Sequence, residues 1–205
     1  MPQATFTQSL GQAVIRLLLP GNIERDIYMS DCEPERCTYG VSKTGFVPAA
    51  SPTDAIAIQG SATKKIRVKS IILNCSGATA NSSNPVQLIK RSAANTGGTS
   101  TVLPLGRHDS TDPVATAVVR LYSANPTGLG AVMDTGADTS IALHGGRVVT
   151  PTSPNNLDRM GFQYAWQGDK GIILNGVNEY LCINLGGAAL VGSPTFDVDI
   201  LLNEE

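Results

Sequence analysis

Residues 54–92 carry the pattern that most constrains the fold of this chain, because apolar residues recur there at every second position. Ile56 and Ile58 precede a turn at Gly60, and the run 66–73 sets β-branched residues against basic ones. A period of two is typical of half-buried β-strands, since successive side chains of a strand point to opposite faces. The stretch therefore predicts strands along one edge of an antiparallel sandwich.

The rest of the chain after Asp54 repeats this organisation. Clusters of Gly, Pro, Asn, Asp and Ser return about every 8 to 20 residues, and short β-branched or aromatic runs lie between them. The last run, TFDVDILL, alternates again from Phe196 onward. We therefore predict an all-β fold: an antiparallel jelly-roll-like β-sandwich over residues 54–205, with about eight or more strands and less than about a tenth helix.

Residues 1–50 differ from this pattern. They contain one apolar stretch, AVIRLLLP at 13–20, followed by a charged loop at 24–40, with no clean alternation over more than a few positions. We expect an N-terminal extension with one or two short strands and no sheet of its own. The segment PAASP at 48–52 is the expected link to the sandwich.

The apolar residues of the extension must be buried somewhere, because each exposed Leu or Ile forgoes about 1.5–3 kcal/mol. A strand added to the edge of a neighbouring subunit would satisfy both backbone and side chains. The candidate interface consists of Ile15, Leu17, Leu19, Ile27 and Tyr28. Val14 would take the place of Ile15 on the shared face only if a bulge follows Ile15.

The charge of the chain argues against nucleic acid as a partner. Charged residues make up only 16% of the chain, against about a quarter in average domains, which favours a surface partly covered by partners or rich in Ser, Thr and Asn. The net charge of −2 gives no reason to expect nucleic acid binding, so the basic run 64–69 is interpreted as a solvated strand face.

No apolar run approaches the roughly 20 residues that cross a bilayer, so no membrane partner is expected. The first residues lack the basic start and long apolar core of a secretory signal. We therefore expect assembly in the cytoplasm, or export by cell lysis rather than by secretion.

The four cysteines fall into two classes. Cys75 and Cys182 lie in apolar runs and are expected to be buried thiols. Cys32 and Cys37 flank the loop EPER, where they are expected to be accessible and are the candidate disulfide. The same spacing could hold two metal ligands, but the chain has no second pair for a zinc site, so no metal is expected.

No catalytic grouping emerges from the remaining polar residues. His108, Asp109 and Asp112 lie together in GRHDSTDP, where Asx side chains and proline favour a turn over a catalytic triad. His144 is interpreted as the end of a strand, and Trp166 as core rather than a sugar-stacking residue. The glycine-rich pieces lack the strand–loop–helix context of phosphate sites. We therefore expect no enzymatic activity and no cofactor.

Three segments carry a resemblance to a known group of proteins. They are TDAIAIQGSATKKIRVKSIILNCSGAT, VQLIKRSAANTGGTSTVLPLGRHDSTDPVATAVVRLYSANPTGLG, and GIILNGVNEYLCINLGG with TFDVDILLNEE. The region from about Asp54 onward resembles small β-sandwich virion structural proteins of tailed bacteriophages. Such proteins decorate capsids or belong to tails and baseplates, often as homotrimers. The resemblance implies a place in the virion, reached after assembly in the host cytoplasm.

The expected function is therefore that of a capsid decoration (cement) protein, a homotrimer that binds the major capsid protein or neighbouring virion proteins. The alternative is a tail or baseplate component, including one that contacts glycans of the host surface. An enzyme built on a sandwich is a third and more distant reading. Copy number per particle separates the first two, and a glycan array separates a receptor binder from a passive clamp.

Overall fold

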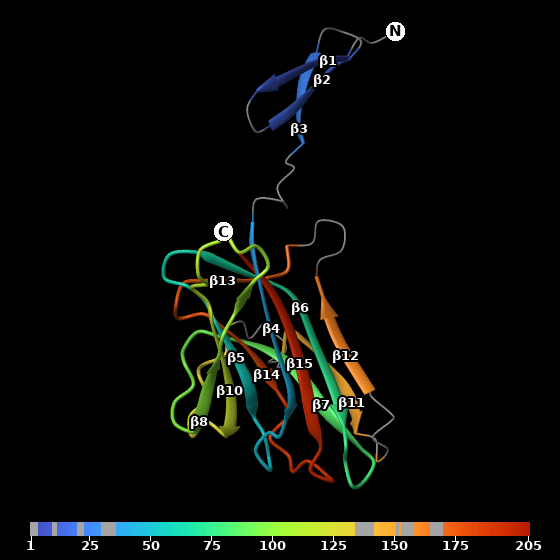
Figure 1. The fold of residues 1–205 in the computed structure, drawn as a ribbon, viewed down its shortest axis with the longest axis vertical. Helices are drawn as coiled ribbons and strands as arrows, with labels where there is room; N and C mark the ends of the chain where they lie inside the picture. Colours follow the sequence, from blue (N-terminus) through green and yellow to red (C-terminus); the bar gives the residue numbers. More distant parts are fainter. Residues whose placement is uncertain are drawn as a thin grey trace. The chain divides into compact units, whose positions relative to one another are not determined.

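The computed structural model describes two units, residues 1–36 and 37–205. The described residues are 4–9, 12–19, 23–29, 36–133, 142–150, 152, 158–164 and 170–205, with the backbone alone described before residue 36. Every regular element in these ranges is a β-strand, as Figure 1 shows. The all-β prediction is therefore confirmed for the part of the chain that is described.

The first unit is a three-stranded antiparallel sheet. Its strands are β1 (Ala4–Ser9), β2 (Gln12–Leu19) and β3 (Ile23–Met29), in that order across the sheet. The expectation that this region has no sheet of its own was wrong. The charged residues of β3 obscured the pattern, because Arg25 and Asp26 stand opposite Leu17 and Arg16 of β2 rather than in a loop.

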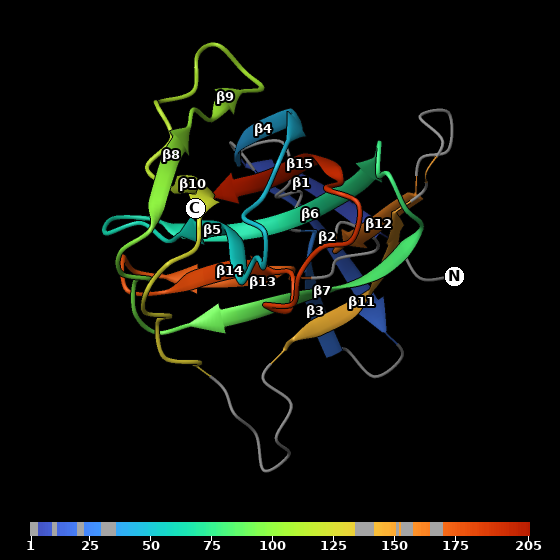
Figure 2. The same ribbon diagram turned by 90° about the horizontal axis from the view of Figure 1, so that it is seen from below.

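In the described part of the second unit, twelve strands form two six-stranded sheets. One sheet has the order β11-β7-β14-β5-β10-β8, and the other has β12-β6-β15-β4-β9 with β13 also paired to β6. Figure 2 shows the two layers, with β6 and β15 in one and β7 and β14 in the other. The strands are β4 (Cys37–Phe46), β5 (Asp54–Gln59), β6 (Lys65–Ser76), β7 (Ser82–Arg91), β8 (Thr99–Leu103), β9 (Gly106–Arg107), β10 (Val118–Ala124), β11 (His144–Thr150), β12 (Asp158–Gln163), β13 (Ile172–Asn175), β14 (Tyr180–Asn184) and β15 (Thr195–Glu204).

Eight of these strands have jelly-roll connectivity. One four-stranded sheet is β12-β6-β15-β4 and the facing sheet is β11-β7-β14-β5, with all pairs antiparallel. Most successive strands along the chain therefore lie in opposite sheets, as in a double Greek key. Of the other four strands, β8, β9 and β10 belong to an insertion between β7 and β11 and extend both sheets beyond β5 and β4, while β13 pairs with β6. The predicted jelly-roll-like sandwich is confirmed.

The core lies between the two sheets and follows the alternation of the strands. Phe196, Val198 and Ile200 of β15 are buried, while Asp199 between them is exposed. On the facing sheet, Ile56 and Ile58 of β5 belong to the same buried cluster. Apolar burial at about 25 cal/mol per Å² is the main source of stability in such a sandwich.

Residues 54–92 do not form an edge of the sandwich, which corrects the expectation from sequence. Strands β5 and β7 lie in one sheet on either side of β14, and β6 lies in the other sheet. The jelly-roll connections carry the chain across the core after each strand, so neighbours in sequence are not neighbours in a sheet. Alternation alone identifies strands but contains no information about which of them pair.

The basic face of β6 also differs from the expected solvated surface. Arg67 and Lys69 are only 8% and 5% exposed, whereas Lys65 is exposed. The Arg67 Nε donates to Glu205 Oε1 at 2.7 Å, and its Nη1 donates to the carbonyl oxygen of Lys170. The segment around residue 170 therefore covers this end of β6.

The first unit ends at Arg36, whereas the sequence predicted an extension over residues 1–50 followed by a sandwich over residues 54–205. Residues 37–46 form β4, which pairs with β15 from Cys37 opposite Glu204 to Phe46 opposite Phe196. The last part of the expected extension is thus an integral strand of the sandwich, and the first unit ends at Arg36.

This boundary generates a prediction for two truncated proteins. Removing residues 1–36 should leave a folded sandwich with an almost unchanged melting temperature. Removing residues 1–50 should prevent folding, because it deletes β4 and the buried side chains Tyr39, Val41 and Phe46. Three such side chains contribute on the order of 5–9 kcal/mol, comparable with the whole stability of a typical domain. Circular dichroism and calorimetry of the two proteins will measure this, and equal stability would contradict the boundary.

Candidate functional site

A cleft lies on the outer face of the sheet that contains β14, β5, β10 and β8. Ala57 and Gln59 of β5 share that face, because they alternate along the strand with Ile56 and Ile58, which point into the core. The strand register places Arg120 of β10 directly opposite Ala57. Small Ala57 therefore forms the floor of the cleft between larger side chains from the neighbouring strands.

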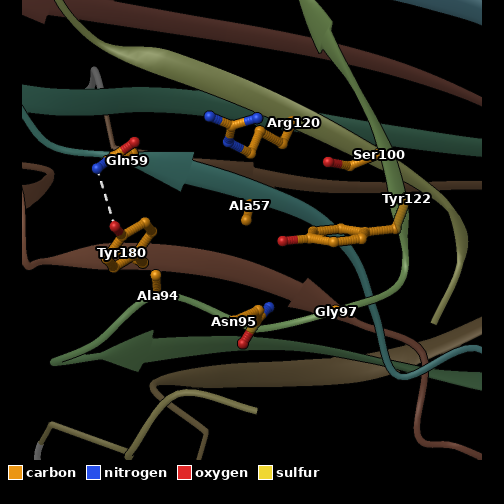
Figure 3. Close-up of a pocket in the computed structure, with 9 residues that line it drawn as sticks. All are labelled: Ala57, Gln59, Ala94, Asn95, Gly97, Ser100, Arg120, Tyr122 and Tyr180. Atoms are coloured by element: carbon orange, nitrogen blue, oxygen red, sulfur yellow. Dashed lines mark hydrogen bonds between the residues drawn. The ribbon is translucent and has the colours of Figure 1, made fainter. Parts of the chain in front are cut away.

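The cleft has a volume of about 270 Å³ and is shown in Figure 3. Tyr122 lies two positions after Arg120 on β10 and stands opposite Ser100 of β8. The side chains of all three residues therefore reach the same face of the sheet. The residues that line the cleft are Ala57, Gln59, Ala94, Asn95, Gly97, Ser100, Arg120, Tyr122 and Tyr180. Most of its lining groups are polar, which distinguishes it from an apolar ligand pocket.

The loop after β7 forms one wall of the cleft and requires two adjacent glycines. Gly97 and Gly98 have φ values of 68° and 75°, a conformation that side chains rarely adopt. A Cβ atom at Gly98 would stand 2.6 Å from the carbonyl oxygen of Asn125. These glycines therefore let the loop turn tightly against the segment that follows β10.

Tyr180 and Gln59 form a hydrogen-bonded pair at one end of the cleft. The Gln59 Nε2 donates to the Tyr180 hydroxyl at 2.8 Å and to the carbonyl oxygen of Val177 at 3.0 Å. Both amide hydrogens of Gln59 are therefore used, and the Tyr180 hydroxyl hydrogen remains available for donation. Burial raises the pKa of Tyr180 and of Tyr122, so both phenols are protonated donors at neutral pH.

Arg120 is the charged residue of the cleft. Its side chain is half-buried, and within the described residues it makes no hydrogen bond or ion pair. Its positive charge acts on both tyrosines, where it opposes the upward pKa shift that burial causes. Five guanidinium N–H donors thus face a polar cleft without an anionic partner from the described chain.

A buried network of charged and amide groups lies beneath this wall. The Asp54 carboxylate accepts two hydrogen bonds from Arg91, at 2.6 and 2.9 Å. It also accepts from Asn95 at 2.8 Å and from Asn184 at 2.7 Å. Arg91 in turn donates to the carbonyl oxygen of Gly130 at 2.7 Å. The network therefore joins β5, β7 and β14 to the loops that surround the cleft.

Burial alone would raise the pKa of the Asp54 carboxyl. The hydrogen bonds from Arg91, Asn184 and Asn95, together with the charge of Arg91, outweigh burial and lower it below its usual value. Asp54 is fully buried and Arg91 is 3% exposed, so the pair is shielded from solvent. An ionised pair in this setting is stable because the Asp54 carboxylate accepts four hydrogen bonds and the Arg91 guanidinium donates three.

The residues around His108 form a turn, as predicted. The Asp109 Oδ1 accepts from the backbone N of Thr111 at 2.8 Å and from its hydroxyl at 2.7 Å. These hydrogen bonds lower the pKa of the exposed Asp109 carboxyl. The Asp112 backbone N donates to the backbone carbonyl oxygen of Asp109 at 3.1 Å, which closes the turn.

His144 begins β11 rather than ending a strand, because β11 runs from His144 to Thr150 and pairs with β7. Its ring lies 5.3 Å from that of Tyr164 and 6.3 Å from that of Phe162. Trp166, which was interpreted as a core residue, lies outside the described residues.

The cysteines divide as predicted where they are described. Cys75 on β6 and Cys182 on β14 are fully buried, which confirms the expectation for both. Cys37 begins β4 as a half-buried free thiol. Cys32 lies outside the described residues, so the candidate Cys32–Cys37 disulfide stays a prediction.

The candidate interface residues of the extension all lie in the three-stranded sheet. The β1–β2 and β2–β3 registers run without a bulge, so Ile15, and not Val14, shares a face with Leu17 and Leu19. Ile27 stands opposite Ile15 on that face, and the alternation places Tyr28 on the other face. Whether these residues form an interface stays a prediction.

The described residues contain no group of three or more His, Cys, Asp or Glu side chains able to hold a metal ion. They also contain no helix long and apolar enough to span a membrane.

The cleft itself was not predicted. Its signal in the sequence is the run VVRLYSA, in which Arg120 and Tyr122 share one face of a strand whose other face is apolar. The partners Gln59, Asn95 and Tyr180 come from distant segments, so only the strand order brings them together.

The Asp54–Arg91 pair generates a stability prediction. Asp54→Asn should destabilise the protein by about 3–5 kcal/mol at pH 7, because it leaves the buried Arg91 without a counter-charge. Since the folded pKa of Asp54 is lowered, its stabilisation is present above the unfolded pKa of about 3.9 and is lost as pH falls through the folded value. Urea unfolding at several pH values will measure both effects. Asp199→Asn, at an exposed position on β15, is the control and should change neither the free energy of unfolding at pH 7 nor its dependence on pH.

A second prediction concerns thiol reactivity in the native protein. Cys37 should react with an alkylating reagent well before Cys75 and Cys182, whose labelling should follow unfolding of the sandwich. Burial raises the pKa of Cys182, which further reduces its reactive thiolate. Peptide mass spectrometry after timed alkylation will resolve each residue. Rapid labelling of Cys75 without denaturant would contradict its burial.

Among the described residues, two candidate features for function are the three-stranded N-terminal sheet and the cleft around Arg120. The sheet offers a layer for packing, and the cleft offers donors to a small polar ligand. Comparison of the chain with family models, curated proteins and solved structures finds no match.

Proposed function

We propose that this protein is a non-enzymatic structural protein of a bacteriophage virion, a capsid decoration (cement) protein that binds and stabilises the head shell as a homotrimer. The resemblance of the region from Asp54 onward to small β-sandwich virion proteins supports the class of particle. The observation that carries the attachment role is the separate three-stranded sheet of the first unit.

This sheet requires a second layer. Stable domains consist of at least two packed layers of secondary structure, whereas the first unit has only one sheet. The unit comprises residues 1–36, and chains below about 40 residues usually need metals, disulfides or association to fold. The missing layer therefore has to come from outside this unit.

The two faces of the sheet differ in composition. Phe6, Ile15 and Ile27 occupy directly opposed positions, which places one apolar row across all three strands. Thr5, Arg16 and Asp26 form the corresponding row on the other face. One face is thus suited to pack on a protein surface while the other is suited to water.

In the proposed arrangement, the N-terminal sheet packs on the capsid shell or on a neighbouring subunit. The sandwich, which has a complete core of its own, forms the body of the trimer. The partners are other copies of the chain and the major capsid protein or neighbouring virion proteins, after assembly in the host cytoplasm.

A tail or baseplate component that contacts host glycans is the second candidate. The polar cleft around Arg120 favours it, because a decoration protein has no need of a small-ligand site. Copy number separates the two functions, since decoration proteins occur in hundreds per particle.

The attachment role predicts a selective loss of particle binding. In the full-length protein, Ile15→Lys places a charge on the apolar face of β2 and should weaken binding to particles that lack the native protein by tenfold or more. Thr7→Lys on the other face is the matched control and should bind normally. Co-sedimentation measures the binding, and light scattering of the unbound protein should give three times the 21.4 kDa chain mass.

Undiminished binding of the Ile15→Lys protein would remove the docking role from the N-terminal sheet. The attachment surface would then have to lie on the sandwich. A monomer mass in light scattering would contradict the trimer.

A further inference from the structure

The cleft around Arg120 is rich in hydrogen-bond donors. Arg120 contributes its guanidinium, Tyr180 contributes a hydroxyl hydrogen, and Tyr122 and Ser100 contribute further hydroxyl groups. The amide hydrogens of Gln59 are already used, which leaves its carbonyl oxygen as an acceptor. A complementary ligand therefore carries mainly acceptors, at least one of them anionic.

Nearby acids do not satisfy Arg120 internally. Asp54, the acid of the network beneath, accepts four hydrogen bonds from Arg91, Asn95 and Asn184. Arg120 is the only charged residue among the nine that line the cleft. A ligand in the cleft thus meets a single positive charge, on the planar guanidinium of Arg120. Two parallel N–H groups of a guanidinium match the two oxygens of a carboxylate.

The size and position of the cleft restrict the rest of the ligand. Its volume of about 270 Å³ lies at the lower end of the roughly 300–1,000 Å³ of small-molecule sites, which suits one ring rather than an extended chain. The side chains of Tyr122 and Tyr180 are mostly buried, with 6% and 8% of their residue surface exposed. In Figure 3 the hydroxyl group of Tyr122 points toward Ala57 and that of Tyr180 toward Gln59, so both phenols place polar groups in the cleft, which suits a hydroxylated ring.

We propose that this cleft binds a sugar ring that carries a carboxylate, with Arg120 bound to the carboxylate and Tyr122, Tyr180, Ser100 and Gln59 bound to ring hydroxyls. The buried network keeps the site preorganised, because Asn95 is held by Asp54 and by the backbone N of Gly130. The ring could come from a uronic acid or from a sialic acid, which share the carboxylate on a pyranose. Such a ligand would bind whether or not the N-terminal sheet attaches the protein to a particle.

The test uses the full-length protein and ligand-observed NMR titration with four probes. Two are acidic, methyl β-D-glucuronide and the α-methyl glycoside of N-acetylneuraminic acid. Methyl β-D-glucoside has a hydroxymethyl group in place of the carboxylate of the glucuronide, and acetate carries the carboxylate without the ring. At least one acidic sugar should bind with a Kd on the order of millimolar, and the neutral sugar and acetate should each bind at least tenfold more weakly.

Variants assign the contact to Arg120. Arg120→Gln should weaken acidic-sugar binding about tenfold or more, because a charge-assisted hydrogen bond is lost. Arg120→Lys keeps the charge without the fork and should be intermediate, and Tyr122→Phe should cost about three- to tenfold. Arg159→Gln on β12, where the arginine is exposed and outside the cleft, is the matched control and should bind as the native protein does. Thermal unfolding checks that each variant is folded.

The acidic sugar that binds identifies the source of the ring. The proposal would be overturned if neither acidic sugar bound, if the glucuronide and the glucoside bound equally tightly, or if the folded Arg120→Gln protein bound the acidic sugar undiminished. Acetate binding as tight as that of the acidic sugar would reduce the cleft to a simple anion site and would also overturn it. Particle attachment is measured separately, so either proposal can fail alone.

Discussion

The buried pair of Asp54 and Arg91 is the interaction on which the arrangement of the sandwich depends most. It stands where β5 begins, where β7 ends and where the loops around the cleft return to the sheet. Burying two charges is costly, and here the cost is offset by four hydrogen bonds to the Asp54 carboxylate and one more from Arg91 to the carbonyl oxygen of Gly130. A buried ion pair that lacked some of these hydrogen bonds would be less stable than apolar side chains in the same place. The same carboxylate therefore stabilises three strands and positions Asn95 in the wall of the cleft.

The insertion between β7 and β11 distinguishes this sandwich from a plain eight-stranded jelly roll. It adds β10 and β8 beyond β5 in one sheet and β9 beyond β4 in the other. The buried Glu204 of β15 helps to hold it, accepting hydrogen bonds from the backbone N atoms of Thr116 and Ala117 at 2.7 and 2.8 Å. The cleft lies where this added part meets the common strands. A ligand site of this kind can change with the insertion while the eight-stranded core is kept.

The sequence predicted the class of fold well because alternation and turn chemistry are local. Phe196, Val198 and Ile200 are buried as their spacing indicates, and Asp109 forms the Asx turn that its neighbours indicate. The pairing of strands is a property of distant segments, so the position of β5, β6 and β7 within the sheets was not predicted. Arg67 was placed in solvent for the same reason, since residues near 170 and 205 cover it. The cleft likewise consists of residues separated by more than a hundred positions, such as Gln59 and Tyr180.

The place of β15 has a consequence for how the protein is made. This strand lies in the interior of its sheet, between β6 and β4, with Cys37 opposite Glu204. A ribosome releases the chain from its N-terminal side, so β4 and β6 emerge long before the strand that joins them. Until residue 204 is free, both expose edges that can pair with other chains. The sandwich therefore closes after synthesis of its last strand, and slow closure of such long-range pairs is the step at which assembly competes with aggregation.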